Sequence, residues 1–170
     1  MATFSPSITP EQAGLIRAAA LFFVASADPR LAAGPDGAGP VNVSPKGGVP
    51  LHVLGRNLVA YLDYSGSGNE TARHATAGGP VTVMVCSFEG GDAAIVRLYG
   101  TARVTPLEVS PLAERLRADA AAHGFWPKRS VVEVTVDRTM TSCGYGVPVM
   151  TQVRQRGRSD RGRRYKAARA

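Results

Sequence analysis

Residues 81–104 read VTVMVCSFEGGDAAIVRLYGTARV, and this stretch decides the fold class. Residues 81–86 are mostly apolar and rich in β-branched side chains, which is typical of a buried strand. Residues 94–104 predict a second, longer strand with a bend at Gly100, and the Glu-Gly-Gly-Asp sequence at 89–92 predicts a hairpin turn between the two. Because a hairpin joins antiparallel strands, the stretch indicates an antiparallel sheet rather than the parallel sheet of dinucleotide-binding proteins.

Outside this hairpin the chain predicts more strands and a few short helices. Strand patterns cover residues 22–26, 41–44, 58–62 and 131–136, and the second of them should stop at Pro45. Helices are expected from Pro10 after a Thr9-x-x-Gln12 capping box, from Asn69 as the cap to the break at Gly78-Gly79-Pro80, and from Ser110-Pro111 to Gly124. Six strands and so few helices favour a mainly β fold, a six-stranded and mostly antiparallel barrel with short helices at its rim.

The positive charge of the chain is concentrated near its C-terminal end. The 170 residues carry a formal net charge of +7, yet residues 154–170 alone hold eight basic residues against one acidic residue, so residues 1–153 are formally neutral. We therefore expect one folded domain over residues 1–153 and a disordered basic tail over 154–170 that contacts polyanions only non-specifically. A protein that binds nucleic acid through this tail is the alternative.

Cysteine and histidine positions predict neither a disulfide framework nor a metal site. The two cysteines, Cys86 and Cys143, lack CxxC spacing, and the histidines at 52, 74 and 123 lie far apart in the sequence. No apolar run approaches the ~20 residues that a membrane-spanning helix needs. We therefore expect no metal and a cytoplasmic protein.

A glycine-serine turn follows one of the expected strands. Residues 61–72 read YLDYSGSGNETA, and the turn at 65–69 combines backbone N–H groups and hydroxyls that can approach a ligand closely, as a phosphate requires. A plain connecting turn is the simplest alternative. A dinucleotide-binding unit is another, but Thr71 replaces the third glycine of its motif, and the helix that follows is too short for a parallel crossover.

A barrel with a phosphate on this turn is the remaining interpretation. A flat ring would then lie against neighbouring strand backbones, and the segment VNVSPKGG at 41–48 could supply them, because Pro45 interrupts a strand edge and leaves backbone groups unpaired. Lys46 would add a cation for the phosphate or for the electron-rich end of a reduced ring.

Five blocks of sequence, in order, resemble one known family. They are VNVSPKGG, AYLDYSGSGNETARHA, VTVMVCSFEG, IVRLYGTARV and VEVTVDRTMTSCGYGVP. Together, over about residues 10–150, they resemble the flavin-binding split-barrel proteins related to pyridoxamine 5′-phosphate oxidase. The resemblance implies an FMN-binding, six-stranded split β-barrel that works as a homodimer, with the flavins at the subunit interface.

The resemblance also implies site residues. Lys46 matches a phosphate-side lysine, and Ser67 matches a phosphate-binding serine. In the family, the backbone of one strand lines the flavin ring, and this strand corresponds here to Asn42, Val43 and Ser44. The residues that match a pair beside the flavin are Asp63 and Tyr64. Where the oxidases carry an Arg-Lys pair on the phosphate, this chain has Gly68 and Asn69. Arg97 could reach the polar edge of the flavin, or it could point outward from the barrel.

The expected function is that of an FMN-dependent oxidoreductase acting on a small molecule. The C-terminal Trp and Arg-rich substrate signature of the true oxidases is absent, and residues 151–170 take its place, so oxidation of pyridoxamine phosphate is not expected. No residue is nominated as catalytic, because a bound flavin carries the chemistry itself. The alternatives are a non-catalytic flavin carrier or stress-related binder, and a related deazaflavin in place of FMN.

Overall fold

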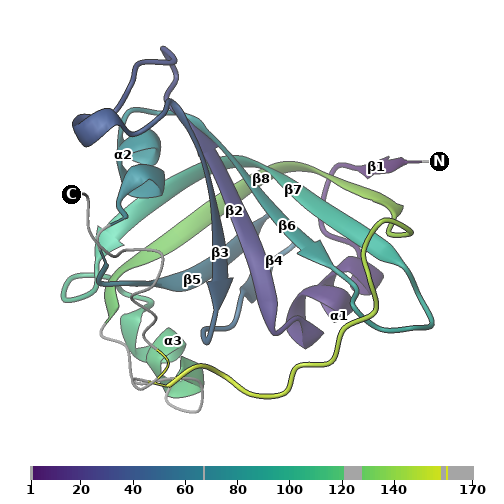
Figure 1. Ribbon diagram of the computed structural model, residues 1–170. Coiled ribbons are helices and arrows are strands. Elements are labelled where there is room, and N and C mark those ends of the chain that lie inside the picture. Colours follow the sequence, from purple (N-terminus) through teal and green to yellow (C-terminus); the bar gives the residue numbers. More distant parts are fainter. Residues whose placement is uncertain (1, 67, 121–127, 158–159, 161–170) are drawn as a thin grey trace, which may run out of the picture.

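Side chains alternate between buried and more exposed positions along the central strands, so one face of the sheet has to be covered. In β2 (Leu21–Ala27) Phe22 and Val24 are fully buried, and in β6 (Pro80–Cys86) Val83 and Val85 are fully buried. The sheet curls round these side chains into a barrel, and its interior is the hydrophobic core (Figure 1).

The computed structural model describes residues 2–66, 68–120, 128–157 and 160. The remaining strands are β1 (Thr3–Ser5), β3 (Val41–Gly47), β4 (His52–Gly55), β5 (Leu58–Tyr64), β7 (Ala94–Pro106) and β8 (Lys128–Cys143). The helices are α1 (Pro10–Ala18), α2 (Glu70–Thr76), α3 (Ala113–Ala120) and the short 3-10 helix η1 (Pro35–Gly37). The strands form one eight-stranded sheet in the order β3-β2-β6-β7-β8-β5-β4, and β1 pairs with β8.

The mainly β, antiparallel split-barrel prediction is confirmed, but the prediction of six strands is wrong. Every strand pair is antiparallel, and the described residues form eight strands. The two that the sequence missed, β1 and β4, have only three and four residues. Strands this short show no periodicity of their own, and their pairing with β8 and β5 defines them.

The predicted stop of a strand at Pro45 is also wrong. β3 runs through Pro45 to Gly47, and Pro45 pairs with Phe23 of β2. Among the described strands β3 pairs only with β2 and so forms one edge of the sheet. An edge strand tolerates proline because its missing N–H can face the open side.

The hairpin at residues 81–104 is confirmed. β6 and β7 pair from Pro80↔Thr101 to Cys86↔Ile95. The expected bend at Gly100 is the position where the register between β7 and β8 shifts. A Cβ at Gly100 would lie 1.8 Å from the carbonyl oxygen of Thr135, so only glycine lets the two backbones approach this closely.

The helices begin and end close to the expected residues. The Thr9–Gln12 capping box of α1 is present, and Gly78, with a φ of 80°, follows the end of α2. Asn69 occupies the N-cap position of α2, but its side chain makes no capping hydrogen bond. α3 begins later than expected, after Ser110 Oγ accepts a hydrogen bond from the Leu112 N–H. The expected helix end at Gly124 lies outside the described residues.

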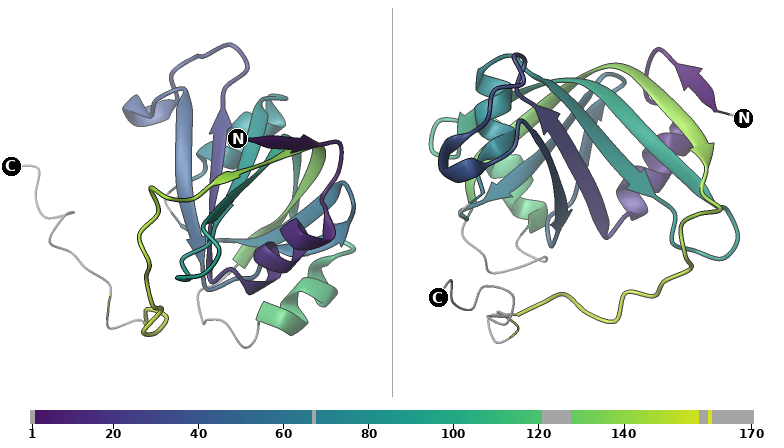
Figure 2. Two further views of the ribbon diagram at one scale, coloured as in Figure 1. Left: turned by 90° about the vertical axis from the view of Figure 1, so that its right-hand side faces the viewer. Right: turned by 45° about the horizontal axis from the view of Figure 1, so that its top comes forward.

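The helices and the C-terminal segment lie around the barrel. In Figure 1 α2 lies at the top of the barrel, and α1 and α3 lie at the bottom. The segment after β8 runs past this lower end, as both views of Figure 2 show. Most of the predicted tail at 154–170 lies outside the described residues. In its described part Arg154 forms an ion pair with Asp160.

No helix in the described part of the chain is both long and apolar enough to cross a membrane.

Candidate functional site

Three charged side chains from three strands meet at the end of β5. The Asp63 carboxylate is almost completely buried. Its Oδ1 accepts a hydrogen bond from Lys46 Nζ at 2.7 Å, and its Oδ2 accepts from Arg129 Nη2 at 2.7 Å and from Arg129 Nε at 3.1 Å. We call Lys46, Asp63 and Arg129 the charge cluster.

The charge cluster carries a surplus of positive charge. Two cations share one carboxylate, so the formal balance is one positive charge. Asp63 is the only hydrogen-bond acceptor of Lys46 Nζ among the described residues, although the ammonium also lies 5.8 Å from the centroid of the Tyr61 ring. Because an ammonium has several N–H donors, Lys46 can bind a further anion without leaving Asp63.

Arg129 joins the charge cluster to the glycine-serine turn. Its Nη2 donates to the carbonyl oxygen of Gly68 at 2.7 Å, and its Nη1 donates to that of Gly66 at 3.3 Å. Ser67, the expected phosphate-binding serine, lies outside the described residues. The structure therefore connects Lys46 and Asp63 to the described ends of the turn through Arg129.

The sequence missed Arg129. It lies 66 positions after Asp63 in the chain, and the antiparallel pairing of β5 with β8 brings the two together. The only sequence signal is its position at the start of the β-branched run of β8, and that signal does not reveal which strand lies opposite.

The other expected site residues on β3 lie on two opposite faces of the strand. Asn42 and Ser44 lie on the same face as Lys46, and Asn42 Nδ2 donates to Ser44 Oγ at 2.9 Å and to Thr71 Oγ1 of α2 at 3.4 Å. Val43 lies on the opposite, outer face and is 63% exposed.

Tyr64 and Arg97 lie on different parts of the sheet. The Tyr64 hydroxyl donates to the carbonyl oxygen of Gly47 at 2.9 Å and so connects β5 with the end of β3. Burial raises the pKa of Tyr64. Arg97 alternates with the buried Val96 and Leu98, so it points outward, and its Nη1 donates to Ser142 Oγ at 3.1 Å. The structure therefore does not bring Arg97 to the charge cluster.

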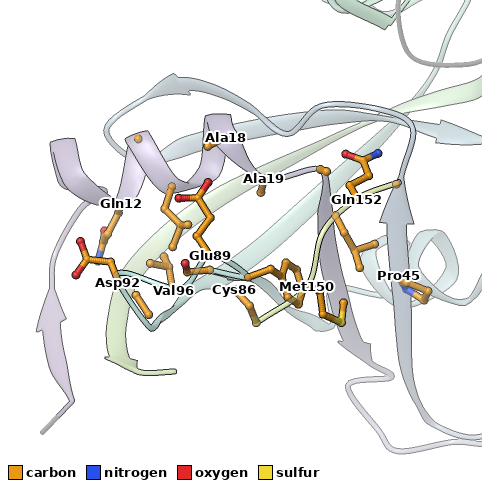
Figure 3. A pocket seen from close by; sticks show the side chains of 18 of the residues that line it. Gln12, Ala18, Ala19, Pro45, Cys86, Glu89, Asp92, Val96, Met150 and Gln152 are labelled. Atoms are coloured by element: carbon orange, nitrogen blue, oxygen red, sulfur yellow. The ribbon is translucent and has the colours of Figure 1, made fainter. Parts of the chain in front are cut away.

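A groove of about 1630 Å³ begins beside the turn. Pro45, Tyr64 and Gly66 line it at one end, and residues of α1, of the β6–β7 loop and of the segment after β8 line the rest. Figure 3 shows Pro45 at one end of this groove and Gln12 and Asp92 at the other. The groove has the room and the partly apolar lining that a flat aromatic ligand needs.

Cys86 also lines the groove, and its thiol is buried. It is 6% exposed, and burial raises the pKa of its thiol, although Arg97 partly opposes this effect. In the described part of the chain no group of three or more His, Cys, Asp or Glu side chains could hold a metal ion.

No protein-family model matches the sequence. A curated protein of Aspergillus flavus, the pyridoxamine 5′-phosphate oxidase family protein ustO, is 35% identical over 133 residues, which is 76% of this chain. The chain spans about half the length of this relative, 49%.

Solved structures share the fold at lower sequence identity. HupZ from Group A Streptococcus superposes with a TM-score of 0.59 at 20% identity, over 78% of this chain and 91% of that one. A putative pyridoxamine 5′-phosphate oxidase from Lactobacillus delbrueckii gives 0.55 at 21% identity, over 79% and 94%. An FMN-binding protein from Syntrophomonas wolfei gives 0.50 at 13% identity, over 74% and 80%. The solved structures show the shared fold, and the curated relative shows that the chain belongs to the pyridoxamine 5′-phosphate oxidase family.

Proposed function

We propose that this chain binds FMN and places the phosphate on the turn at residues 65–69, next to the charge cluster. The observation that carries the proposal is the surplus positive charge of this cluster, with N–H donors of Lys46 still available, beside the described ends of the turn. Gly66 of this turn also lines the groove. Family membership and the FMN-binding protein of the same fold support the choice of ligand.

The residues present fit a flavin monophosphate. Lys46 would hold the phosphate by charge, and Ser67, Gly68 and Asn69 would add hydroxyl and backbone donors. β3 is a sheet edge in the described structure, so its backbone at residues 42–44 has polar groups to offer to a ring. Asp63 and Tyr64 would lie beside the ligand. One surplus charge suits a monophosphate better than a diphosphate, which favours FMN over FAD.

We further propose that the protein is an oxidoreductase acting on a small molecule. Bound FMN would supply the hydride and electron transfer. The protein would bind and orient the ring and limit access of water. Because burial raises the pKa of Tyr64, its hydroxyl stays protonated at neutral pH and keeps donating to Gly47, which makes it a fixed wall of the groove rather than a base.

Titration of the purified protein with FMN, riboflavin and FAD tests the proposal. We expect FMN to bind at least about tenfold more tightly than riboflavin, because riboflavin lacks the phosphate that one charge-assisted hydrogen bond would stabilise by ~1.5 to 3 kcal/mol. FAD should bind less tightly than FMN. Quenching of flavin fluorescence measures all three affinities. Equal affinities for FMN and riboflavin would show that the phosphate is not recognised here.

A non-catalytic flavin carrier or stress-related binder is the second candidate, because it would keep the same phosphate turn. Oxidation of a reduced nicotinamide in the presence of electron acceptors distinguishes the two: steady turnover supports an enzyme, and its absence with the flavin bound supports a carrier. A deazaflavin with one phosphate is the alternative ligand, and the same titration can include it.

We also propose that the protein is a homodimer formed through the outer face of the β3 side of the sheet. Val41 and Val43 are 60% and 63% exposed on β3, and Pro45, Phe23 and Met84 continue this apolar face across the paired strands. Exposed apolar side chains gathered on one face mark an interaction surface. Replacing Val43 with Asp should convert the dimer to a monomer by light scattering.

Val109 provides the control for this substitution. It is 70% exposed but belongs to the connection between β7 and α3 and not to the strands β3, β2 and β6 that form this apolar face. Val109→Asp should therefore leave the dimer intact. A wild-type protein that is already monomeric at micromolar concentration would contradict the dimer.

The division of the chain stays a proposal as well. Residues 1–153 would form the flavin-binding domain, and the basic residues at 154–170 would contact polyanions non-specifically, with an affinity that falls steeply as salt rises.

A further inference from the structure

Arg129 lies at an irregular position of the sheet. The pairing of β5 with β8 runs from Leu58↔Thr135 to Asp63↔Ser130 and then shifts to Tyr64↔Lys128, so Arg129 is the extra residue of a bulge. A β-bulge changes the direction of the side chain at that position, and bulges are frequent next to functional sites. Here the bulge directs the guanidinium to the turn that follows β5.

Nearly the whole guanidinium is occupied by the protein itself. Nε and Nη2 bind Asp63 Oδ2, Nη2 also binds the carbonyl oxygen of Gly68, and Nη1 binds that of Gly66. Arg129 thus fastens the turn at two carbonyl groups, one on each side of position 67. Only the planar, multi-donor shape of arginine can make these contacts together.

These contacts also determine which polar groups of the turn remain available. In a trans peptide the C=O and the following N–H point in opposite directions, and the described chain contains no cis peptide bond. Because the Gly68 carbonyl points at the guanidinium, the N–H of Asn69 points away from it. This donor therefore faces the side of the turn opposite to Arg129.

Lys46 and Arg129 take different parts in the charge cluster. Lys46 uses one hydrogen bond to Asp63 and keeps further donors, whereas Arg129 spends its donors on Asp63 and on the two carbonyl groups of the turn. The two cations therefore suit different tasks, direct binding of an anion by Lys46 and fixation of the turn by Arg129.

We propose that Arg129 is the positioning residue of the phosphate site: it fixes the carbonyl groups of Gly66 and Gly68, so that the turn can bind a monophosphate, and does not itself bind the phosphate. The inference rests on the proposed FMN site. It adds a residue of β8 to that site and assigns it a task for which the shape of the guanidinium is needed in addition to its charge.

Arg129→Lys and Arg129→Met test this assignment. Lysine keeps the charge but cannot make the same set of hydrogen bonds, so both variants should lose at least about tenfold in affinity for FMN, since more than one charge-assisted hydrogen bond is lost. Affinity for riboflavin should change only slightly, because riboflavin does not use the turn. The measured quantity is the ratio of the FMN affinity to the riboflavin affinity. General damage to the structure would lower both affinities and leave this ratio unchanged.

Arg103→Lys is the matched control. Arg103 Nη2 pairs with Glu133 Oε1 at 2.8 Å on the same sheet, and its side chain is 70% exposed, so this variant should keep the wild-type ratio. If Arg129→Met fails to fold, the affinity ratios of Arg129→Lys and Arg129→Gln test the positioning role instead. A wild-type ratio in Arg129→Lys would overturn the positioning role while leaving the FMN site intact. A wild-type protein without preference for FMN over riboflavin would overturn both proposals.

Discussion

Replacing Lys46 with Met and Ser67 with Ala together is expected to weaken FMN binding by at least about a hundredfold, because charge-assisted hydrogen bonds worth ~1.5 to 3 kcal/mol each are lost. Asp63 keeps its two hydrogen bonds from Arg129 in this variant, so no buried carboxylate is left unpaired and the fold should survive. Fluorescence titration measures the loss, and riboflavin should bind the variant nearly as it binds the wild type.

Lys166→Met serves as the control for net charge. Lys166 belongs to the tail at 154–170, and its replacement removes the same charge without changing the charge cluster. Because the proposed tail takes no part in the proposed FMN site, this variant should leave the FMN affinity within about twofold of the wild-type value. Unchanged FMN binding by the Lys46 and Ser67 variant would place the phosphate somewhere else on the molecule.

Replacing Asp63 with Ala should lower the free energy of unfolding by ~3 to 5 kcal/mol, the range for removing one partner of a buried ion pair. The side chains of Lys46 and Arg129 are only 15% and 28% exposed, and without the carboxylate they would face each other as like charges. Arg129 would also lose the partner that orients it toward the turn. Chemical denaturation in the absence of flavin measures this effect separately from ligand binding.

The pair between Arg103 and Glu133 again supplies the comparison. The Arg103 side chain is 70% exposed although Glu133 is buried, so Arg103→Ala should lower the free energy of unfolding by less than Asp63→Ala does. Equal effects of Asp63→Ala and Arg103→Ala would mean that water screens the charge cluster as strongly as it screens a pair with one exposed partner.

The parts of the fold that could be predicted are those with strong local patterns. The hairpin at 81–104 has two long β-branched runs around a glycine turn, and the helix at Pro10 has a complete capping box, so local sequence determines both. Family resemblance implied flavin-site roles for Lys46, Asp63 and the turn, and these roles stay predictions. The structure places Lys46 and Asp63 in one ion pair.

The parts that could not be predicted depend on contacts between distant segments. β3 passes through Pro45 because it lies at the sheet edge, and only the strand order shows which strand is an edge. β4 exists because His52 and Val53 pair with β5. Arg129 reaches the turn because a register shift makes it a bulge residue, and no spacing along the chain signals such a shift.

The position of β8 in the chain has a consequence for how the protein folds. β8 has 16 residues and pairs with β7, β5 and β1, so the barrel cannot close before residues 128–143 have left the ribosome. Until then β5 has an unpaired edge, and its partner is separated from it by a long stretch of chain. Such non-local pairing slows folding, typically to the range of ~milliseconds to seconds. We expect this unpaired edge of β5 to be the place where a chaperone or a second nascent chain competes with β8 during synthesis.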